Sequence, residues 1–344
     1  MPEIFRVSQS KLRTWRRCHR QYYYQHILKL TRRAPPNPLV RGTIIHSMIE
    51  NFISGLDPWK AWAEAQKTYG KLFKQEREEY GDIPGDIEAL MHAYFRWYEK
   101  DPLSYYEVDG HYAEHFFQVP LTPGIIMEGT IDSSAYSRDK RFWMVEHKSH
   151  KEIPRGDIKY SDIQSGIYTW VMPQIGLPKP DGVMWNYIRM KRPTVPEPLK
   201  NGEMSRRDID TTWEVYETAL KKAKLNPRDY LDMKSKLAGK EGEFFIRVAL
   251  PISKVIQENL IEEAVITARE IKRKAGIDKT RNIDRHCTYC SFYMLCQAQL
   301  RGLDDKAILK LQFKQEEKDR YADKQNALTP ERFPKTQGGK KGRA

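Results

Sequence analysis

Long apolar runs are absent from this chain. No stretch of its 344 residues approaches the roughly eighteen uninterrupted apolar residues that mark a membrane span. The N-terminus is charged from the start and lacks the apolar region of a secretory signal. We therefore expect no membrane partner and a cytoplasmic location, where disulfide bonds are disfavoured. A Walker A motif is also absent, which excludes a helicase motor within this sequence.

Cysteine is scarce, and three of the four cysteines stand close together. They form Cys287-x2-Cys290-x5-Cys296, and the fourth is Cys18. Such spacing can present several thiolates to one metal centre, whereas buried apolar thiols or a redox pair are the alternatives. Four thiolates suit zinc and an iron–sulfur cluster alike. Either metal would fasten the two ends of the chain together and stabilise the fold.

Acidic residues are few in the N-terminal part of the chain. The whole sequence has 59 Lys and Arg against 46 Asp and Glu, a net charge of +13 that favours a polyanionic partner. Residues 1–41 contain ten of the basic residues and one acid. Aromatic residues lie among them, so phosphate contacts and base stacking could occur side by side, although a solvated basic face explains the pattern equally well. The candidate DNA contacts are Arg13, Arg16, Arg17, Arg20 and Tyr22.

The order of periodic patterns predicts an α/β fold. Helical patterns are separated by strand patterns at 112–120, 124–136, 142–148 and 182–190. Helices are expected at 11–29, after Arg41-Gly42, and at 59–80, 87–99, 158–171, 207–223 and 253–274. We predict a central mixed sheet flanked by helices in one domain, residues 1–312. Its parts are a mainly helical 1–110, an α/β core 111–190 and a helical 191–300, followed by a basic, disordered tail 313–344.

Two acidic residues and a lysine lie near the ends of two expected strands. The polar segment 137–140 between these strands predicts a hairpin that places Asp132 beside Glu146. Glu146 and Lys148 share one face of their strand, and His147 points to the other face. Two carboxylates and a lysine so placed can hold a divalent metal and activate water on a phosphodiester. Solvated surface charges are the alternative.

Taken together, these motifs resemble the RecB/AddB-type branch of the PD-(D/E)XK nuclease superfamily. That branch includes the iron–sulfur exonucleases associated with CRISPR adaptation. The resemblance covers roughly residues 8–300, and His19 departs from the proline usual after the first cysteine. The matching motifs, in order, are Ser8-x-Ser10-x-Leu12-x-x-Trp15-x-x-Cys18, Gly42-x-x-x-His46, Asp132, Glu146-x-Lys148-Ser149, Gln164-x-x-x-Tyr168 and the cysteine triplet.

The resemblance implies a restriction-endonuclease-like fold and a role for each motif. Mg²⁺ or Mn²⁺ would be held by His46, Asp132 and Glu146, with Glu114 as a further acid. Lys148 would position or help deprotonate the attacking water, or neutralise developing charge. Gln164 and Tyr168 would contact the substrate strand or brace Lys148. Cys18, Cys287, Cys290 and Cys296 would ligate a [4Fe–4S] cluster, with Zn²⁺ as the alternative.

The expected function is therefore a metal-dependent DNA exonuclease. It would act on single-stranded DNA or DNA ends in recombination, repair, or the processing of phage or mobile-element DNA. A separate helicase or recombination protein is the expected partner, and relatives include toroidal oligomers. The competing hypothesis is a non-catalytic nucleic-acid-binding or adaptor protein with a structural zinc site.

Overall fold

The chain folds into two compact units. A computed structural model describes residues 4–33, 37–70, 78, 81–108, 110–152 and 162–316. The first unit, Met1–Arg13 with Ala34–Lys272, is called the sheet unit here, and the second, Thr14–Arg33 with Arg273–Ala344, the cysteine unit. No helix within the described residues has the length and apolar composition needed to cross a bilayer.

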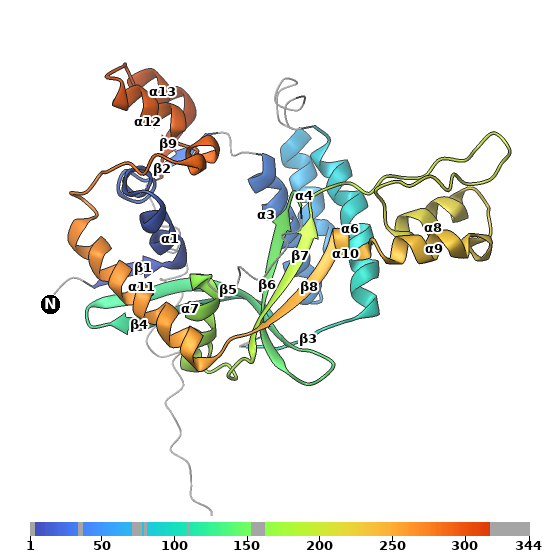
Figure 1. Cartoon of the computed structure of the whole chain (residues 1–344), viewed down its shortest axis with the longest axis horizontal. Helices are drawn as coiled ribbons and strands as arrows, with labels where there is room; N and C mark the ends of the chain where they lie inside the picture. The colour runs from blue at the N-terminus through green and yellow to red at the C-terminus, as the bar shows by residue number, and fades with distance from the viewer. Residues whose placement is uncertain are drawn as a thin grey trace, which may run out of the picture. The chain divides into compact units, whose positions relative to one another are not determined.

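A seven-stranded mixed sheet forms the centre of the sheet unit (Figure 1). The strand order is β1-β5-β6-β7-β8, and β3 and β4 also pair with β5. β1 with β5 and β6 with β7 are parallel, and the other pairs are antiparallel. The strands are β1 Phe5–Ser8, β3 Ser104–Tyr105, β4 Ala113–Thr122, β5 Ile125–Tyr136, β6 Phe142–His150, β7 Gly182–Arg189 and β8 Phe245–Pro251.

This sheet confirms the predicted α/β class with a mixed central sheet. The four predicted strands appear as β4, β5, β6 and β7, with ends shifted by one or two residues. Strands β1, β3 and β8 were not predicted. β1 and β3 contain four and two residues, which is too short for an alternating pattern to stand out from the sequence.

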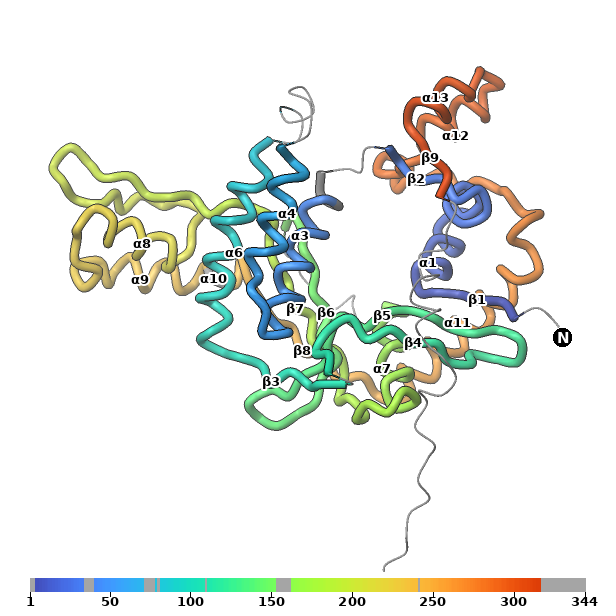
Figure 2. The backbone as a smooth tube through the Cα atoms, turned by 180° about the vertical axis from the view of Figure 1, so that it is seen from behind, coloured from blue at the N-terminus to red at the C-terminus, as the bar shows by residue number. Residues whose placement is uncertain are grey.

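Helices cover both faces of the sheet. Ser149 and Asn186 point to the face covered by α3 and α6, since Ser149 lies against Gly42 and Asn186 bonds to Tyr94. Figure 2 shows α3, α4 and α6 gathered beside β6, β7 and β8, with α7 beside β4 and β5. The flanking helices are α3 Asn37–Ile53, α4 Trp59–Gly70, α6 Ile83–Lys100, α7 Ile163–Val171, which runs on into η3 Met172–Ile175, and α11 Lys254–Lys274.

Several helix bounds differ from those expected. α3 begins at Asn37, five residues before Gly42, and α6 begins at Ile83, where Asp82 caps the helix by accepting the Gly85 N–H. Residues 71–77 and 79–80, within the helix expected at 59–80, lie outside the described residues, as do residues 153–161 before α7.

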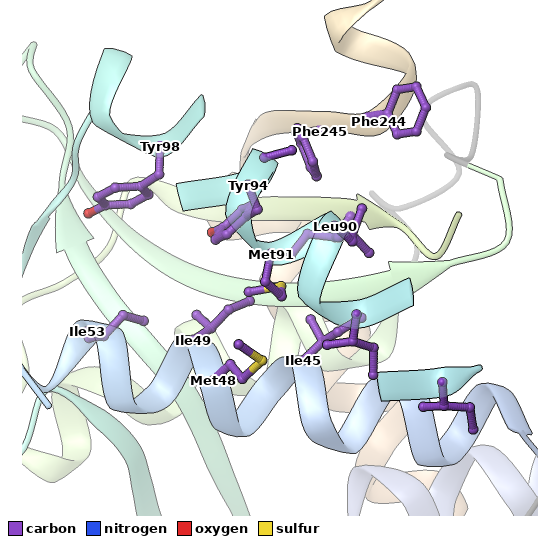
Figure 3. Packing of buried hydrophobic residues seen from close by; sticks show 14 of the residues in the cluster. Ile45, Met48, Ile49, Ile53, Leu90, Met91, Tyr94, Tyr98, Phe244 and Phe245 are labelled. Carbon is purple, nitrogen blue, oxygen red and sulfur yellow. The ribbon is translucent and has the colours of Figure 1, made fainter. Parts of the chain in front are cut away.

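A large apolar cluster joins α3 and α6 to the sheet (Figure 3). Ile45, Met48 and Ile49 form one buried stripe of α3 at helical spacing. They pack with Leu90, Met91 and Tyr94 of α6, with Phe244 just before β8 and with Phe245, the first residue of β8. Full burial of such side chains contributes about 1.5–3 kcal/mol each, so this cluster holds α3 against α6 and the sheet.

A smaller helical group in the sheet unit has its own core. It comprises α8 Trp213–Lys222, η4 Pro227–Tyr230 and α9 Leu231–Ala238, and α10 Glu241–Phe244 then leads into β8. α8 begins later than the predicted 207 because Thr212 caps it, accepting the N–H of Val215. The buried residues of this core include Trp213, Tyr216, Leu220, Tyr230, Met233 and Leu237.

The cysteine unit combines segments from both ends of the chain. Its N-terminal segment contains the end of α1 Gln9–Arg17, then α2 His19–Tyr22, the π-helix η1 Tyr23–Ile27 and β2 Leu30–Arg32. Its C-terminal segment contains η5 Arg285–Tyr289, α12 Tyr293–Leu300, α13 Lys306–Gln312 and β9 Phe313–Gln315. β2 pairs antiparallel with β9, and Tyr24 packs with Phe292, Leu295 and Phe313.

Two sequence predictions are corrected in this unit. The helix expected at 11–29 is three helical pieces, because Cys18 has an extended backbone between α1 and α2. The tail expected from residue 313 starts instead with a strand, since Phe313 is buried and β9 pairs with β2. Residues 317–344 lie outside the described residues.

Candidate active site

Along one edge, β5 changes its strand partner from β1 to β6, and Asp132 lies between the two pairings. This place is called the fork here. The pairing of β5 with β1 ends at Glu128, and its pairing with β6 begins at Ser133. In the interval, Gly129, Thr130 and Ile131 pair along one edge with β4, and among the described strands neither β1 nor β6 pairs with Gly129–Asp132 along the other edge. Oδ2 of Asp132 accepts the backbone N–H of His147 at 3.0 Å. This side chain thus takes the place of a backbone partner and lies against β6.

Glu146 and Lys148 lie on β6 at the same fork. Nζ of Lys148 forms an ion pair and hydrogen bond with Oε1 of Glu146. Glu146 is only 2% exposed, and within the described residues its Oε2 has no hydrogen-bond partner. A buried, unpaired carboxylate oxygen is costly. The site therefore offers an acceptor that a hard cation would satisfy.

The charges of the three residues depend on one another. Burial, and then the neighbouring Glu146 carboxylate, raise the pKa of Asp132 well above its usual value, while Lys148 opposes this shift. Burial disfavours the charge of Lys148, but the Glu146 and Asp132 carboxylates outweigh it and raise the pKa of Lys148. Lys148 is therefore an ammonium ion at neutral pH in this structure.

His46 approaches the same site from α3. Its Nδ1 lies 3.8 Å from Oδ2 of Asp132. Burial, and then the Lys148 ammonium, lower the pKa of His46. The imidazole is accordingly neutral, the form that ligates a metal ion.

The glycine one turn before His46 lets α3 approach the sheet closely. A Cβ at residue 42 would lie 3.0 Å from Oγ of Ser149 on β6. Residues 42 and 46 are four apart and share a helix face. The predicted Gly-x-x-x-His spacing therefore has a physical basis: glycine makes the contact with β6, and His46 reaches the fork.

We expect Gly42→Ala to disturb this approach. Replacing glycine by alanine in a helix with room for the methyl group stabilises by about 0.5–1 kcal/mol. At residue 42 we expect this gain to be cancelled or reversed, because the methyl group meets Ser149 Oγ. Urea unfolding of the wild type, Gly42→Ala, Ser149→Ala and the double variant measures the coupling free energy. If the double variant recovers the stabilisation expected for alanine in a helix, the contact is confirmed. If the effects of the two substitutions on the free energy of unfolding are simply additive, the contact is contradicted.

A buried polar network behind β6 was missed by sequence analysis. Nδ1 of His147 lies 2.8 Å from Nδ2 of Asn186, whose amide is also 2.8 Å from the Tyr94 hydroxyl. Nε2 of His147 lies 3.5 Å from Oγ of Ser133. Burial, and then neighbouring His46, lower the pKa of His147 well below its usual value, so the ring is neutral. The network fixes the strand whose N–H holds Asp132, and strand alternation alone had shown only that His147 points away from the site.

Gln164 and Tyr168 lie on α7 and are both buried, at 7% and 6% exposure. They do not form an exposed helix face. A Cβ at Gly129 would lie 3.0 Å from the Tyr168 hydroxyl, so glycine is needed where Tyr168 packs over β5. Within the described residues, the Gln164 side chain makes no hydrogen bond to Asp132, Glu146 or Lys148; its predicted contact with substrate stays a prediction.

Glu114 lies close to the acidic pair. It falls between the register pairs Ala113↔Ser133 and His115↔Ile131, which places it opposite Asp132. Its charge contributes to the raised pKa of Asp132. Glu114 is exposed and has a φ of 57°, which is unusual for a residue other than glycine.

The four cysteines share one cavity of about 40 Å³ in the cysteine unit. All four are free thiols and half-buried. Burial raises the pKa of Cys290, and the nearby thiols of Cys18, Cys287 and Cys296 raise it further. Nε of Arg281 donates to Sγ of Cys296 at 3.3 Å. The fold thus brings Cys18 to the triplet, as a shared metal ligand set requires.

Neither candidate site is arranged as a formed metal centre. Across the described part of the chain, no group of three or more His, Cys, Asp or Glu side chains is placed to hold a metal ion. The metal assignments at His46, Asp132 and Glu146 and at the four cysteines therefore rest on residue chemistry and on proximity within each unit.

The candidate DNA-binding residues have different environments. Arg16 and Arg17 are exposed. Arg13 bonds to the carboxylate of Asp162, at 3.2 Å, and Nε of Arg20 donates to the Lys279 carbonyl, at 2.8 Å. Tyr22 is 3% exposed, and its ring packs edge-on against Trp15 with 5.2 Å between centroids. The predicted stacking of Tyr22 on DNA bases is therefore wrong, because the ring belongs to the core.

Comparison with known proteins places the chain in a family. A sequence profile of the PD-(D/E)XK nuclease superfamily matches residues 6–297. One solved structure, described as "Crystal structure of SSO0001", is similar at 12% sequence identity and a TM-score of 0.33, covering 87% of this chain and 88% of the other. No curated protein matches the sequence. Since the profile spans most of the chain and includes Asp132, Glu146 and Lys148, the chain belongs to the PD-(D/E)XK nuclease superfamily.

Proposed function

We propose that the protein is a Mg²⁺- or Mn²⁺-dependent DNA exonuclease of the RecB/AddB type. It hydrolyses phosphodiester bonds in single-stranded DNA or at DNA ends. The observation that carries this proposal is the fork between β5 and β6, where Asp132, Glu146 and Lys148 meet and Glu146 keeps a buried, unpaired oxygen. Superfamily membership supports a nuclease, and the net charge of +13 favours a polyanionic substrate.

Asp132 and Glu146, with neutral His46, would hold the divalent cation. Hard carboxylate oxygens suit Mg²⁺ and Mn²⁺, and the unpaired Oε2 of Glu146 provides one such ligand. Glu114, opposite Asp132, is a further acid for the same cation. A cation bound there supplies a water of lowered pKa and neutralises charge at the scissile phosphate.

Lys148 would act as a fixed positive charge in this reaction. Its Nζ pairs with Oε1 of Glu146, next to the unpaired Oε2 that would bind the cation. At this place its ammonium group would neutralise the negative charge that develops on the phosphate oxygens. Tyr168 and Gln164 would brace the site from α7.

The four cysteines would hold a [4Fe–4S] cluster, with Zn²⁺ as the alternative. Their shared cavity brings four thiols of the described residues together, and such thiols ionise when they bind a metal. The role is structural: the cluster would join the two segments of the cysteine unit. Recombination, repair or mobile-element processing, with a separate helicase or recombination partner, would be the setting.

A comparison of linear and circular DNA tests the proposal. We expect the wild type with Mn²⁺ to degrade end-labelled linear single-stranded DNA and to leave a covalently closed single-stranded circle intact. Asp132→Asn should lower the rate about 10²–10⁴-fold. Asp139→Asn, the same substitution in the exposed turn of the same hairpin, is the control and should leave the rate unchanged.

Two outcomes would contradict parts of this proposal. Cleavage of the circle would show an endonuclease instead of an exonuclease. DNA binding without hydrolysis of any substrate, in a protein containing zinc, would support the non-catalytic adaptor.

A further inference from the structure

Most of the net positive charge lies in the cysteine unit. Residues 14–33 contain six Lys and Arg and no acid, and residues 273–316 contain nine Lys and Arg and five acids. These two segments carry a net charge of +10, out of +13 for the whole chain. Such a concentration in so few residues marks this unit as a surface for a polyanion.

Two tyrosine rings of the same unit are exposed. Tyr289 is 91% exposed at the end of η5, and Tyr293 is 44% exposed at the start of α12. By contrast, Tyr22 and Tyr24 are buried at 3% and 1%. The structure therefore buries two of the aromatic residues of the basic N-terminal segment and exposes another pair, which flanks Cys290 in the sequence.

Exposed arginines accompany these tyrosines. Arg17 is exposed and lines the same cavity as Tyr293. Arg285, also exposed, precedes Tyr289 by four residues. Arg20 and Arg281 instead make hydrogen bonds within the protein. Nε of Arg20 donates to the Lys279 carbonyl, and Nε of Arg281 donates to Sγ of Cys296.

The two rings are close enough to serve one strand. Tyr289 and Tyr293 are four residues apart, so their Cα atoms lie at most about 14 Å from each other. Neighbouring nucleotides of an extended strand could therefore reach both rings. Aromatic faces stack on any unpaired base, whereas the bases of a duplex are already stacked on one another.

We propose that Tyr289 and Tyr293 form a stacking platform for the bases of single-stranded DNA, with Arg17 and Arg285 neutralising its phosphates. This inference rests on the proposed function, because it takes DNA as the substrate. It adds the residues that would recognise an unpaired strand and assigns this recognition to the cysteine unit. The occupant is a single strand, since the surface combines high positive charge with accessible rings.

Binding measured without cleavage tests the platform. Fluorescence anisotropy of a labelled oligothymidylate, with no added divalent cation, gives the affinity of the full chain. We expect Tyr289→Ala combined with Tyr293→Ala to weaken single-strand binding about 10–100-fold. Duplex affinity and the slope of log affinity against log salt should stay unchanged, because the phosphate contacts remain. The double Phe variant should bind like the wild type, since it keeps both rings.

Controls separate stacking from damage to the fold or to the metal site. Leu311→Ala removes another exposed apolar side chain of the unit, which is 74% exposed, and should not change binding. Metal content is measured for every variant. An oligonucleotide with abasic positions should bind the wild type as weakly as the intact strand binds the double Ala variant.

The proposal is overturned if the double Ala variant, with its metal content intact, binds single strands like the wild type. An equal loss of duplex and single-strand affinity would also overturn it. Its failure is separable from failure of the proposed function. A chain that binds through the tyrosines but never hydrolyses DNA loses the exonuclease assignment alone, and one that hydrolyses DNA without needing these rings loses the platform alone.

Discussion

We expect Lys148→Ala to lower the rate of DNA hydrolysis by about 10³-fold at saturating DNA and Mn²⁺, the scale of losing one charge-stabilising group in a transition state. The reason lies in the fork. Lys148 pairs with Glu146, and its charge also lowers the pKa of Asp132. Removing the ammonium leaves two neighbouring carboxylates without a compensating positive charge and removes a stabilising partner of the developing phosphate charge.

The matched control is Lys140→Ala. Lys140 is exposed in the turn at the other end of the β5–β6 hairpin, so its loss removes the same charge away from the fork. Single-turnover degradation of end-labelled single-stranded DNA, with excess enzyme, compares both variants with the wild type. Near-equal rates for Lys148→Ala and the wild type would remove Lys148 from the chemistry, whereas a large loss in Lys140→Ala would point to a general charge effect.

Cys18→Ser produces the second large effect, on metal content and stability. We expect anaerobically purified wild type to be brown and the variant to lose both the visible absorbance and the bound metal. Because metal coordination is coupled to folding, the free energy of unfolding should fall by on the order of several kcal/mol. The pairing of β2 with β9 and the cluster around Tyr24 and Phe292 remain, so a destabilised fold is expected instead of an unfolded chain.

Metal analysis and urea unfolding measure these changes. Ser291→Ala is the control, because it removes a small polar side chain between Cys290 and Cys296 without removing a thiol. Unchanged metal content and stability in Cys18→Ser would exclude Cys18 as a ligand. A colourless wild type with one zinc ion per chain would keep the four-cysteine site and contradict the iron–sulfur cluster.

The fold class was accessible from the sequence because its longer strands carry clear patterns. β4, β5, β6 and β7 contain eight to twelve residues each, long enough for apolar and polar periodicity to emerge. β1, β2 and β9 contain three or four residues and acquire their structure from their partners. The interruption of the helix at Cys18 and the burial of Tyr22 could not be predicted either, since both depend on tertiary packing.

Local spacing determined the candidate motifs of the site. The hairpin pattern predicted that Asp132 and Glu146 would be neighbours, and alternation along the strand predicted a common face for Glu146 and Lys148. The contact of Gly42 with Ser149 and the buried network of His147, Asn186 and Tyr94 join segments far apart in the chain. No local pattern encodes such contacts.

By itself, the sequence determined the superfamily motifs, the mixed α/β class and the concentration of positive charge, because composition and short spacing are local properties. Only the tertiary structure decided how these parts are arranged. It opened the fork between β5 and β6 that turns Asp132 toward His147, and it assembled Cys18 with the distant cysteine triplet. It also buried Tyr22 while exposing Tyr289 and Tyr293. The physical reason is that burial and pairing depend on which remote segments pack together.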